Sequence, residues 1–182
     1  PSALAFSEAI ADSVQQRTGR FFWTNGVEFS AWPISAVLAR RIVYVDLPLT
    51  VLGRTDKSWG SNTQMCNPGR DRIQAFINDV DHERKHSPLS NFTTCNLMAE
   101  GMLTAKSLFA DEFADYQFDE VRFLRGTMQQ LIGRRSVGVD VNREIDEAIT
   151  YAAKYPSLVE ELKAQLQAKP AKASVLMACS ST

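Results

Sequence analysis

Residues 19–62, GRFFWTNGVEFSAWPISAVLARRIVYVDLPLTVLGRTDKSWGSN, decide the fold that this sequence predicts. The apolar segment from Phe29 to Leu38 predicts a helix, in spite of the proline within it. The β-branched and aromatic run at 42–45, IVYV, then predicts a strand that is buried on both faces. A second short strand is expected at 49–52, and Pro48, which has no N–H group to donate, places it at a sheet edge or bend. The stretch therefore predicts a small α/β element.

Candidate site residues lie on both sides of this element. Glu28 is a lone carboxylate among apolar neighbours at the start of the predicted helix. Residues 54–62 are polar and contain glycine, which is typical of a surface loop. Trp23, in the aromatic cluster 21–23, is expected either in the core or on the wall of a cleft. An acid, a strand edge and a polar loop so close in sequence form a candidate site, because functional residues concentrate on loops that a rigid scaffold positions.

The composition predicts an ordinary globular protein with one domain as the default. The chain has 182 residues, of which 45% are hydrophobic and 23% charged, with 20 basic and 21 acidic side chains. This balance excludes a general nucleic-acid binder, which needs a clear basic excess. No apolar run reaches the length of about 18 residues that a membrane span needs, and no signal peptide is recognisable. Three widely spaced cysteines predict reduced thiols in a cytoplasmic protein rather than disulfides.

Outside the strand pair, the periodicity of apolar residues predicts helices almost throughout. The expected helices cover residues 7–18, 71–85, 93–109, 118–134, 140–154 and 157–168. Gly19 and Gly138 are suited to end helices, and Asp140 and Ser157 are suited to cap their N-termini.

The predicted fold class is α/β with helices dominant, in three regions. Residues 1–69 carry the strand pair, and residues 70–168 form a helical region. Residues 169–182 lack a periodic apolar face, so we expect a disordered tail there.

Several segments carry a resemblance to a known family. They are GRFFWTNGVEFSAW at 19–32, IVYVDLPLTVLGRTDKSWGSN at 42–62, RDRIQAFI at 70–77, SPLSNFTTCNLMAEGMLTAK at 87–106 and LFADEF at 108–113. In this order they resemble the later part of bacterial family 2 glycosyltransferases of the GT-A type, over roughly residues 2–150. In that family a GRFF segment leads to an acidic residue that opens a helix, and an N-x-x-A-E element lies in a helical tail. The resemblance implies that residues 1–69 are the C-terminal part of a GT-A-like domain.

The same resemblance implies an activity and roles for the candidate residues. The activity is transfer of a sugar from a nucleotide-sugar donor to a hydroxyl acceptor. Glu28 matches the catalytic base, which takes the proton of the acceptor hydroxyl. The implied substrate-binding residues are Trp23, Arg54, Lys57, Ser58, Trp59 and Gly60. A lysine, a hydroxyl and backbone amides beside glycine suit the donor diphosphate. Judged by the residues alone, Glu28 is better explained as a first-turn acid that complements the helix dipole.

One part of the family's pattern is missing from these 182 residues. Family members begin with an α/β half that binds the nucleotide-sugar and ends in an Asp-x-Asp motif, which holds Mg²⁺ or Mn²⁺. The only Asp-x-Asp here is Asp79-Val80-Asp81, in the predicted helical region, so we assign no metal ligand. The resemblance therefore implies the acceptor-side portion of an enzyme. Such a portion is expected to pair with the missing half or to self-associate, because its sheet edge would be exposed.

A different motif indicates a second function. Residues 82–86, His82-Glu83-Arg84-Lys85-His86, spell the H-E-x-x-H pattern of zinc metallopeptidases, and Glu100 is a candidate third ligand. However, Arg84 and Lys85 lie between the two histidines, and cations disfavour binding of a dication. Pro88 also ends the helix directly after the second histidine. We interpret the pattern as a chance match at a solvated helix end.

A third hypothesis is a non-catalytic helical interaction module. An apolar stripe supports it, formed by Leu97, Met98, Met102 and Leu103. Such stripes are more often part of a core than of an interface.

Overall fold

The computed structural model describes residues 7–21, 27–43, 85–91, 93–136 and 138–167, with the backbone alone at 27 and 28. In chain order its elements are α1 (Glu8–Thr18), α2 (Val27–Leu38), α5 (Thr94–Leu108), α6 (Glu120–Ser136), α7 (Asn142–Tyr151), the 3₁₀ helix η1 (Ala152–Lys154) and α8 (Pro156–Gln167). None of the described residues belongs to a β-strand. The predicted dominance of helices is confirmed.

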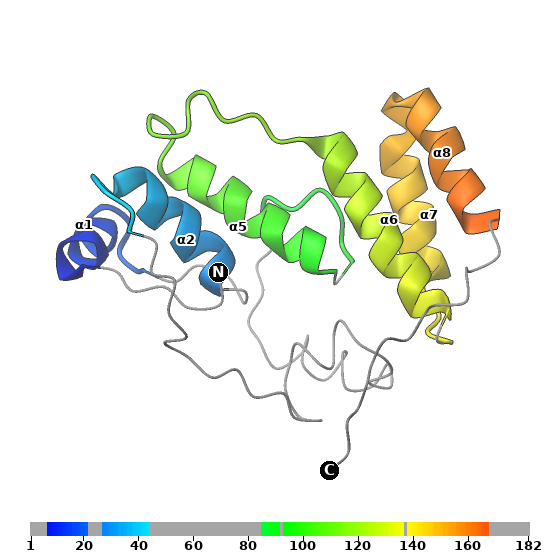
Figure 1. Ribbon diagram of the computed structural model, residues 1–182, viewed down its shortest axis with the longest axis horizontal. Helices are drawn as coiled ribbons and strands as arrows, with labels where there is room; N and C mark the ends of the chain where they lie inside the picture. The colour runs from blue at the N-terminus through cyan, green and yellow to red at the C-terminus, as the bar shows by residue number, and fades with distance from the viewer. Residues whose placement is uncertain (1–6, 22–26, 44–84, 92, 137, 168–182) are drawn as a thin grey trace, which may run out of the picture.

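The helices follow one long axis, with α5 in the middle (Figure 1). At one end lie α1 and α2, and at the other end α6, α7 and α8 pack together. α2 and α5 lie side by side and run in the same direction, and their contact is the largest between any two described helices. From the end of α5, the chain returns over the top of the molecule to the start of α6 (Figure 1).

The larger apolar core lies between α6, α7 and α8. Its buried members are Leu89, Ala99, Phe123, Leu124, Met128, Leu131, Val141, Ile145, Ala148, Ala152, Leu158 and Leu162. Leu124, Met128 and Leu131, at successive turns of α6, have no exposed surface. These three side chains therefore form the buried stripe against which α7 and α8 pack.

The smaller apolar core joins α1, α2 and α5. It contains Val14 of α1, Ile34 of α2 and Ala105 of α5, together with Phe109 and Phe113 from the segment after α5. α5 contributes to both cores, since it also supplies Ala99 to the larger one. The two cores are thus connected through consecutive turns of one helix.

Local signals in the sequence explain where several helices begin and end. Gly19 ends α1 in the left-handed conformation (φ +80°), which only glycine adopts without strain, and its N–H donates to the carbonyl of Gln15 at 2.8 Å. Gly138, with φ +87°, follows α6 in the same conformation. At the start of α5, the Thr93 hydroxyl accepts the N–H of Asn96 at 3.2 Å. Both glycine predictions are confirmed.

The predicted caps of the last two helices do not coincide with the helix starts in the structure. α8 begins at Pro156, so Ser157 lies inside the helix and is not its N-cap. The reason is that proline favours the first helical position, where no N–H is needed. At α7 the cap residue is Val141, although Oδ1 of Asp140 accepts the N–H of Asn142 at 3.2 Å and so performs the capping bond.

The predicted strand pair is not observed in the described residues. Ile42 and Val43 are 70% and 65% exposed and lie in no strand, so their predicted burial is wrong. They follow the end of α2 and belong to neither apolar core. The rest of both predicted strands, the boundary at residue 69 and the tail 169–182 lie outside the described residues.

Candidate functional site

Most of the predicted substrate-binding residues cannot be placed. Trp23, Arg54, Lys57, Ser58, Trp59 and Gly60 all lie outside the described residues. The predicted base, Glu28, is the second residue of α2. The structure therefore gives the position of one predicted site residue, and the site is built from the helix that carries it.

The position of Glu28 is the first turn of a twelve-residue helix. The first four N–H groups of a helix have no acceptor within it, and their dipoles favour a negative charge nearby. The backbone around residue 28 therefore favours a negative charge.

A close contact with α5 holds the start of α2 in place. Gly101 of α5 lies against Phe29, and a Cβ atom added to Gly101 would be only 2.5 Å from both the carbonyl carbon and the oxygen of Phe29. Pro33 lies inside α2 and has no N–H, so the Phe29 carbonyl lacks its usual helical donor. The backbone of α5 therefore approaches α2 at the turn where the proline interrupts the hydrogen bonds, next to Glu28.

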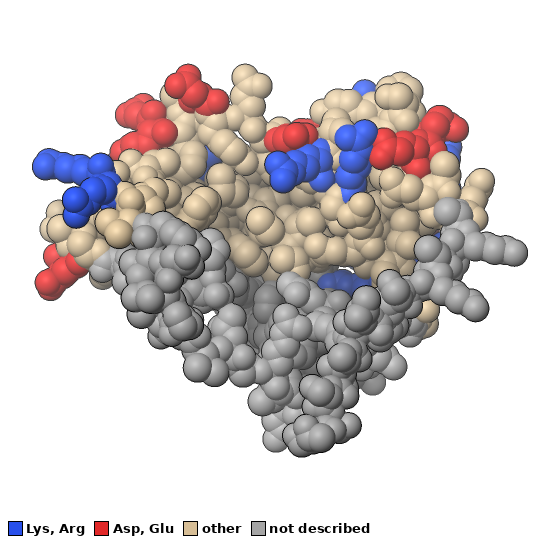
Figure 2. Space-filling view, viewed as in Figure 1, with Lys and Arg blue, Asp and Glu red and all other residues tan. Residues whose placement is uncertain are grey.

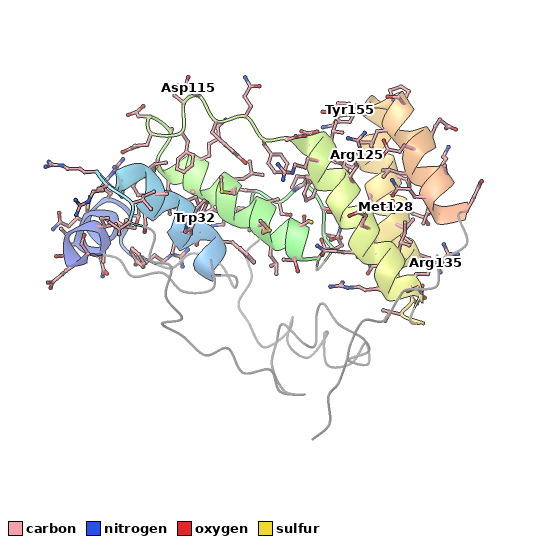
Figure 3. The ribbon with its side chains drawn as sticks, in the orientation of Figure 1. Trp32, Asp115, Arg125, Met128, Arg135 and Tyr155 are labelled. Carbon is pink, nitrogen blue, oxygen red and sulfur yellow. The ribbon has the colours of Figure 1, made fainter. Side chains whose placement is uncertain are left out.

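One residue of this helix was missed by the sequence analysis. Trp32 is 43% exposed, whereas its neighbours Ala31 and Ile34 are 3% and 0% exposed. It projects from α2 (Figure 3). In a helix, position 32 lies one turn after position 28 on the same face. The sequence analysis gave Trp32 no role beyond the apolar character of the predicted helix.

The N-x-x-A-E element of α5 forms the best-defined polar cluster of the described residues. Glu100 is only 5% exposed, and its carboxylate accepts three consecutive backbone N–H groups. These are the N–H groups of Lys85 and His86, both at 3.1 Å, and of Ser87 at 2.5 Å. A buried carboxylate needs such donors, because it would otherwise lose its hydration without compensation.

Asn96, one turn before Glu100, holds the continuation of the same segment. Its amide nitrogen donates to the carbonyls of Leu89 at 2.7 Å and Asn91 at 2.6 Å. Its amide oxygen is paired with the hydroxyl of Ser87. Asn96 and Glu100 therefore fix residues 85–91 against one face of α5, and we call this group the α5 clamp. Its role in the described residues is structural.

The α5 clamp bears on the H-E-x-x-H motif. His86 lies in an irregular segment rather than in a helix, so it does not share a helical face with His82. Pro88 and the capture of three N–H groups by Glu100 account for this conformation. Both oxygens of Glu100 are occupied by these bonds, which is against its prediction as a third zinc ligand. His82 and Glu83 lie outside the described residues.

No metal site is found in the part of the chain that the structure describes. It contains no group of three or more His, Cys, Asp or Glu side chains that could hold an ion. The residues in view therefore do not fit the Mg²⁺ or Mn²⁺ of the resembled family, and we derive no step through a metal. Asp79 and Asp81 lie outside the described residues.

The remaining charged clusters join helices. Glu120, at the start of α6, forms an ion pair with Lys154 of η1 and accepts the hydroxyl of Tyr155 at 3.1 Å. Burial by itself raises the pKa of Glu120, but the hydrogen bonds from Lys154 and Tyr155 outweigh it and lower the pKa below its ordinary value. A bidentate pair, Arg125 to Glu161, connects α6 with α8. These groups are engaged with one another, which favours a structural role.

Cys95 is not a candidate nucleophile. Burial raises the pKa of its thiol, so the reactive thiolate is disfavoured at neutral pH. Its sulfur accepts a hydrogen bond from the side-chain amide of Gln130 at 3.2 Å. A Cβ atom added to Gly126 would lie only 2.7 Å from this sulfur. The thiol therefore packs between α5 and α6.

Comparison of the chain with family models, with curated proteins and with solved structures gave no significant match. Among the described helices, none has the length and apolar character needed to cross a membrane.

Proposed function

We propose that this chain is the acceptor side of a cytoplasmic glycosyltransferase of the GT-A type, with Glu28 as the catalytic base. The reaction transfers a sugar from a nucleotide-sugar to a hydroxyl. Glu28 takes the hydroxyl proton while the oxygen forms a bond to the anomeric carbon of the donor. The bond from that carbon to the diphosphate oxygen breaks, and its electron pair leaves with the nucleoside diphosphate. Donor binding is assigned to residues 54–60 and to a half that these 182 residues do not include.

The observation that carries this proposal is the position of Glu28 in the first turn of α2. The first turn of a helix favours a negative charge, and Gly101 of α5 lies against the backbone of Phe29 in that turn. A base needs both properties, because proton transfer requires the correct charge and a defined position. The described part of α2 has no other titratable residue that could serve.

The test uses the whole protein encoded by the gene that contains this sequence, assayed with a panel of UDP-, GDP- and dTDP-sugars. Glu28→Gln keeps the shape of the side chain but removes the proton acceptor. We expect kcat to fall by about 10²–10⁴-fold, the usual contribution of general base catalysis. Donor affinity should be unchanged, and the free energy of unfolding should change by less than about 1 kcal/mol.

Glu8→Gln is the matched control, since Glu8 is the first-turn acid of α1 and is exposed. It changes the same helix-dipole interaction without removing a base, so turnover should be retained. Normal turnover in Glu28→Gln would show that Glu28 only complements the dipole of α2. Loss of folding would mark it as a structural acid.

A further inference from the structure

We draw no further inference here: the strongest candidate, the apolar surface that α2 exposes at Trp32 and Val37, where Figure 2 shows few charged side chains over α2 and α5, carries nothing because nothing in the described residues shows what covers it.

Discussion

Glu100 illustrates how a single buried charge can organise a loop. Its carboxylate has two oxygens and receives three N–H groups from consecutive residues, so the backbone at 85–87 is held from one point. A side chain that is acceptor-only fits this task, because each of the three groups it meets is a donor. The acid of the N-x-x-A-E element thus has a physical explanation that requires no catalysis.

The first prediction follows from this arrangement. Glu100→Gln keeps the size of the side chain but replaces one acceptor oxygen by an NH₂ group, which would face backbone N–H donors. We expect the free energy of unfolding, measured by urea titration, to fall by about 2–3 kcal/mol. This is the order of magnitude for losing hydrogen bonds to a charged group and leaving a buried donor without an acceptor.

Glu160→Gln is the control for Glu100. Its side chain is 78% exposed and is paired only with Lys163 at 3.5 Å, so its replacement should have almost no effect. Equal stability of the two variants would contradict the role of Glu100 in the α5 clamp. Faster amide exchange at residues 85–87 in Glu100→Gln alone would support it.

The packing of α2 on α5 requires a residue without a Cβ atom at position 101. At Gly101 a methyl group would lie 2.5 Å from backbone atoms of Phe29, and backbone cannot move aside as a flexible side chain can. The two helices must therefore separate, or α2 must shift, if this position is filled. Since Phe29 follows Glu28 in α2, the glycine also positions the backbone of the proposed base.

The second prediction concerns this contact. Gly101→Ala should lower the free energy of unfolding by about 1–3 kcal/mol, because the clash exceeds the gain in helix propensity of about 1 kcal/mol. Gly133→Ala in α6 is the control, since no atom lies within 4 Å of its added Cβ. That change should stabilise the protein by about 0.5–1 kcal/mol. Thermal or urea unfolding measures both changes in the free energy of unfolding. Changes of the same sign in the two variants would show that Gly101 and Phe29 are not in close contact.

The 3₁₀ helix η1 aligns two side chains with the start of α6. Lys154 forms an ion pair with Glu120 and lies over the rings of Tyr151 and Tyr155, 4.2 and 5.5 Å from their centroids. The hydroxyl of Tyr155 also donates to Glu120. This cluster connects the first turn of α6 with the junction of α7 and α8.

The third prediction is the pH dependence of this junction. The pKa of Glu120 is lowered in the folded protein, because the hydrogen bonds from Lys154 and Tyr155 outweigh the effect of burial. A lowered folded pKa means that the stabilisation is present above the ordinary glutamate pKa of about 4.3 and is lost as the pH falls through the folded value. The difference in unfolding free energy between wild type and Glu120→Gln should therefore be largest near neutral pH and shrink below about pH 4.

Urea titrations from neutral to acidic pH measure this difference directly. Lys154→Met is the companion variant, because it removes the charge that favours ionised Glu120 and keeps most of the apolar stem. It should reduce the pH dependence without removing the carboxylate. A difference between wild type and Glu120→Gln that grows toward low pH would contradict the assignment.

The molecule as a whole depends on α5. Its turn at Ala99 belongs to the core with α6, α7 and α8, and its turn at Ala105 belongs to the core with α1 and α2. The same helix carries the α5 clamp and the glycine that receives α2. Residues from both predicted regions, before and after residue 69, therefore share a core through one element.

What the sequence by itself determined is the set of described helices and several of their ends; the predicted helix at 71–85 lies outside the described residues except for Lys85, which is not helical. Apolar residues at helical spacing predicted every described helix, and Gly19 and Gly138 marked ends, because periodicity and the conformational preference of glycine act over a few residues. The role of Glu28 as a base rests on the family resemblance and stays a prediction.

Only the tertiary structure decided which side chains are covered. The apolar pattern of α2 gave no reason to separate Trp32 from Ile34, yet one is 43% exposed and the other is fully buried. Similarly, Glu100 was expected to be a candidate ligand and instead binds backbone 13 to 15 residues earlier, while Gly101 meets Phe29 from a distant part of the chain. Such partners are brought together by helix packing, and neither the spacing nor the chemistry of nearby residues specifies it.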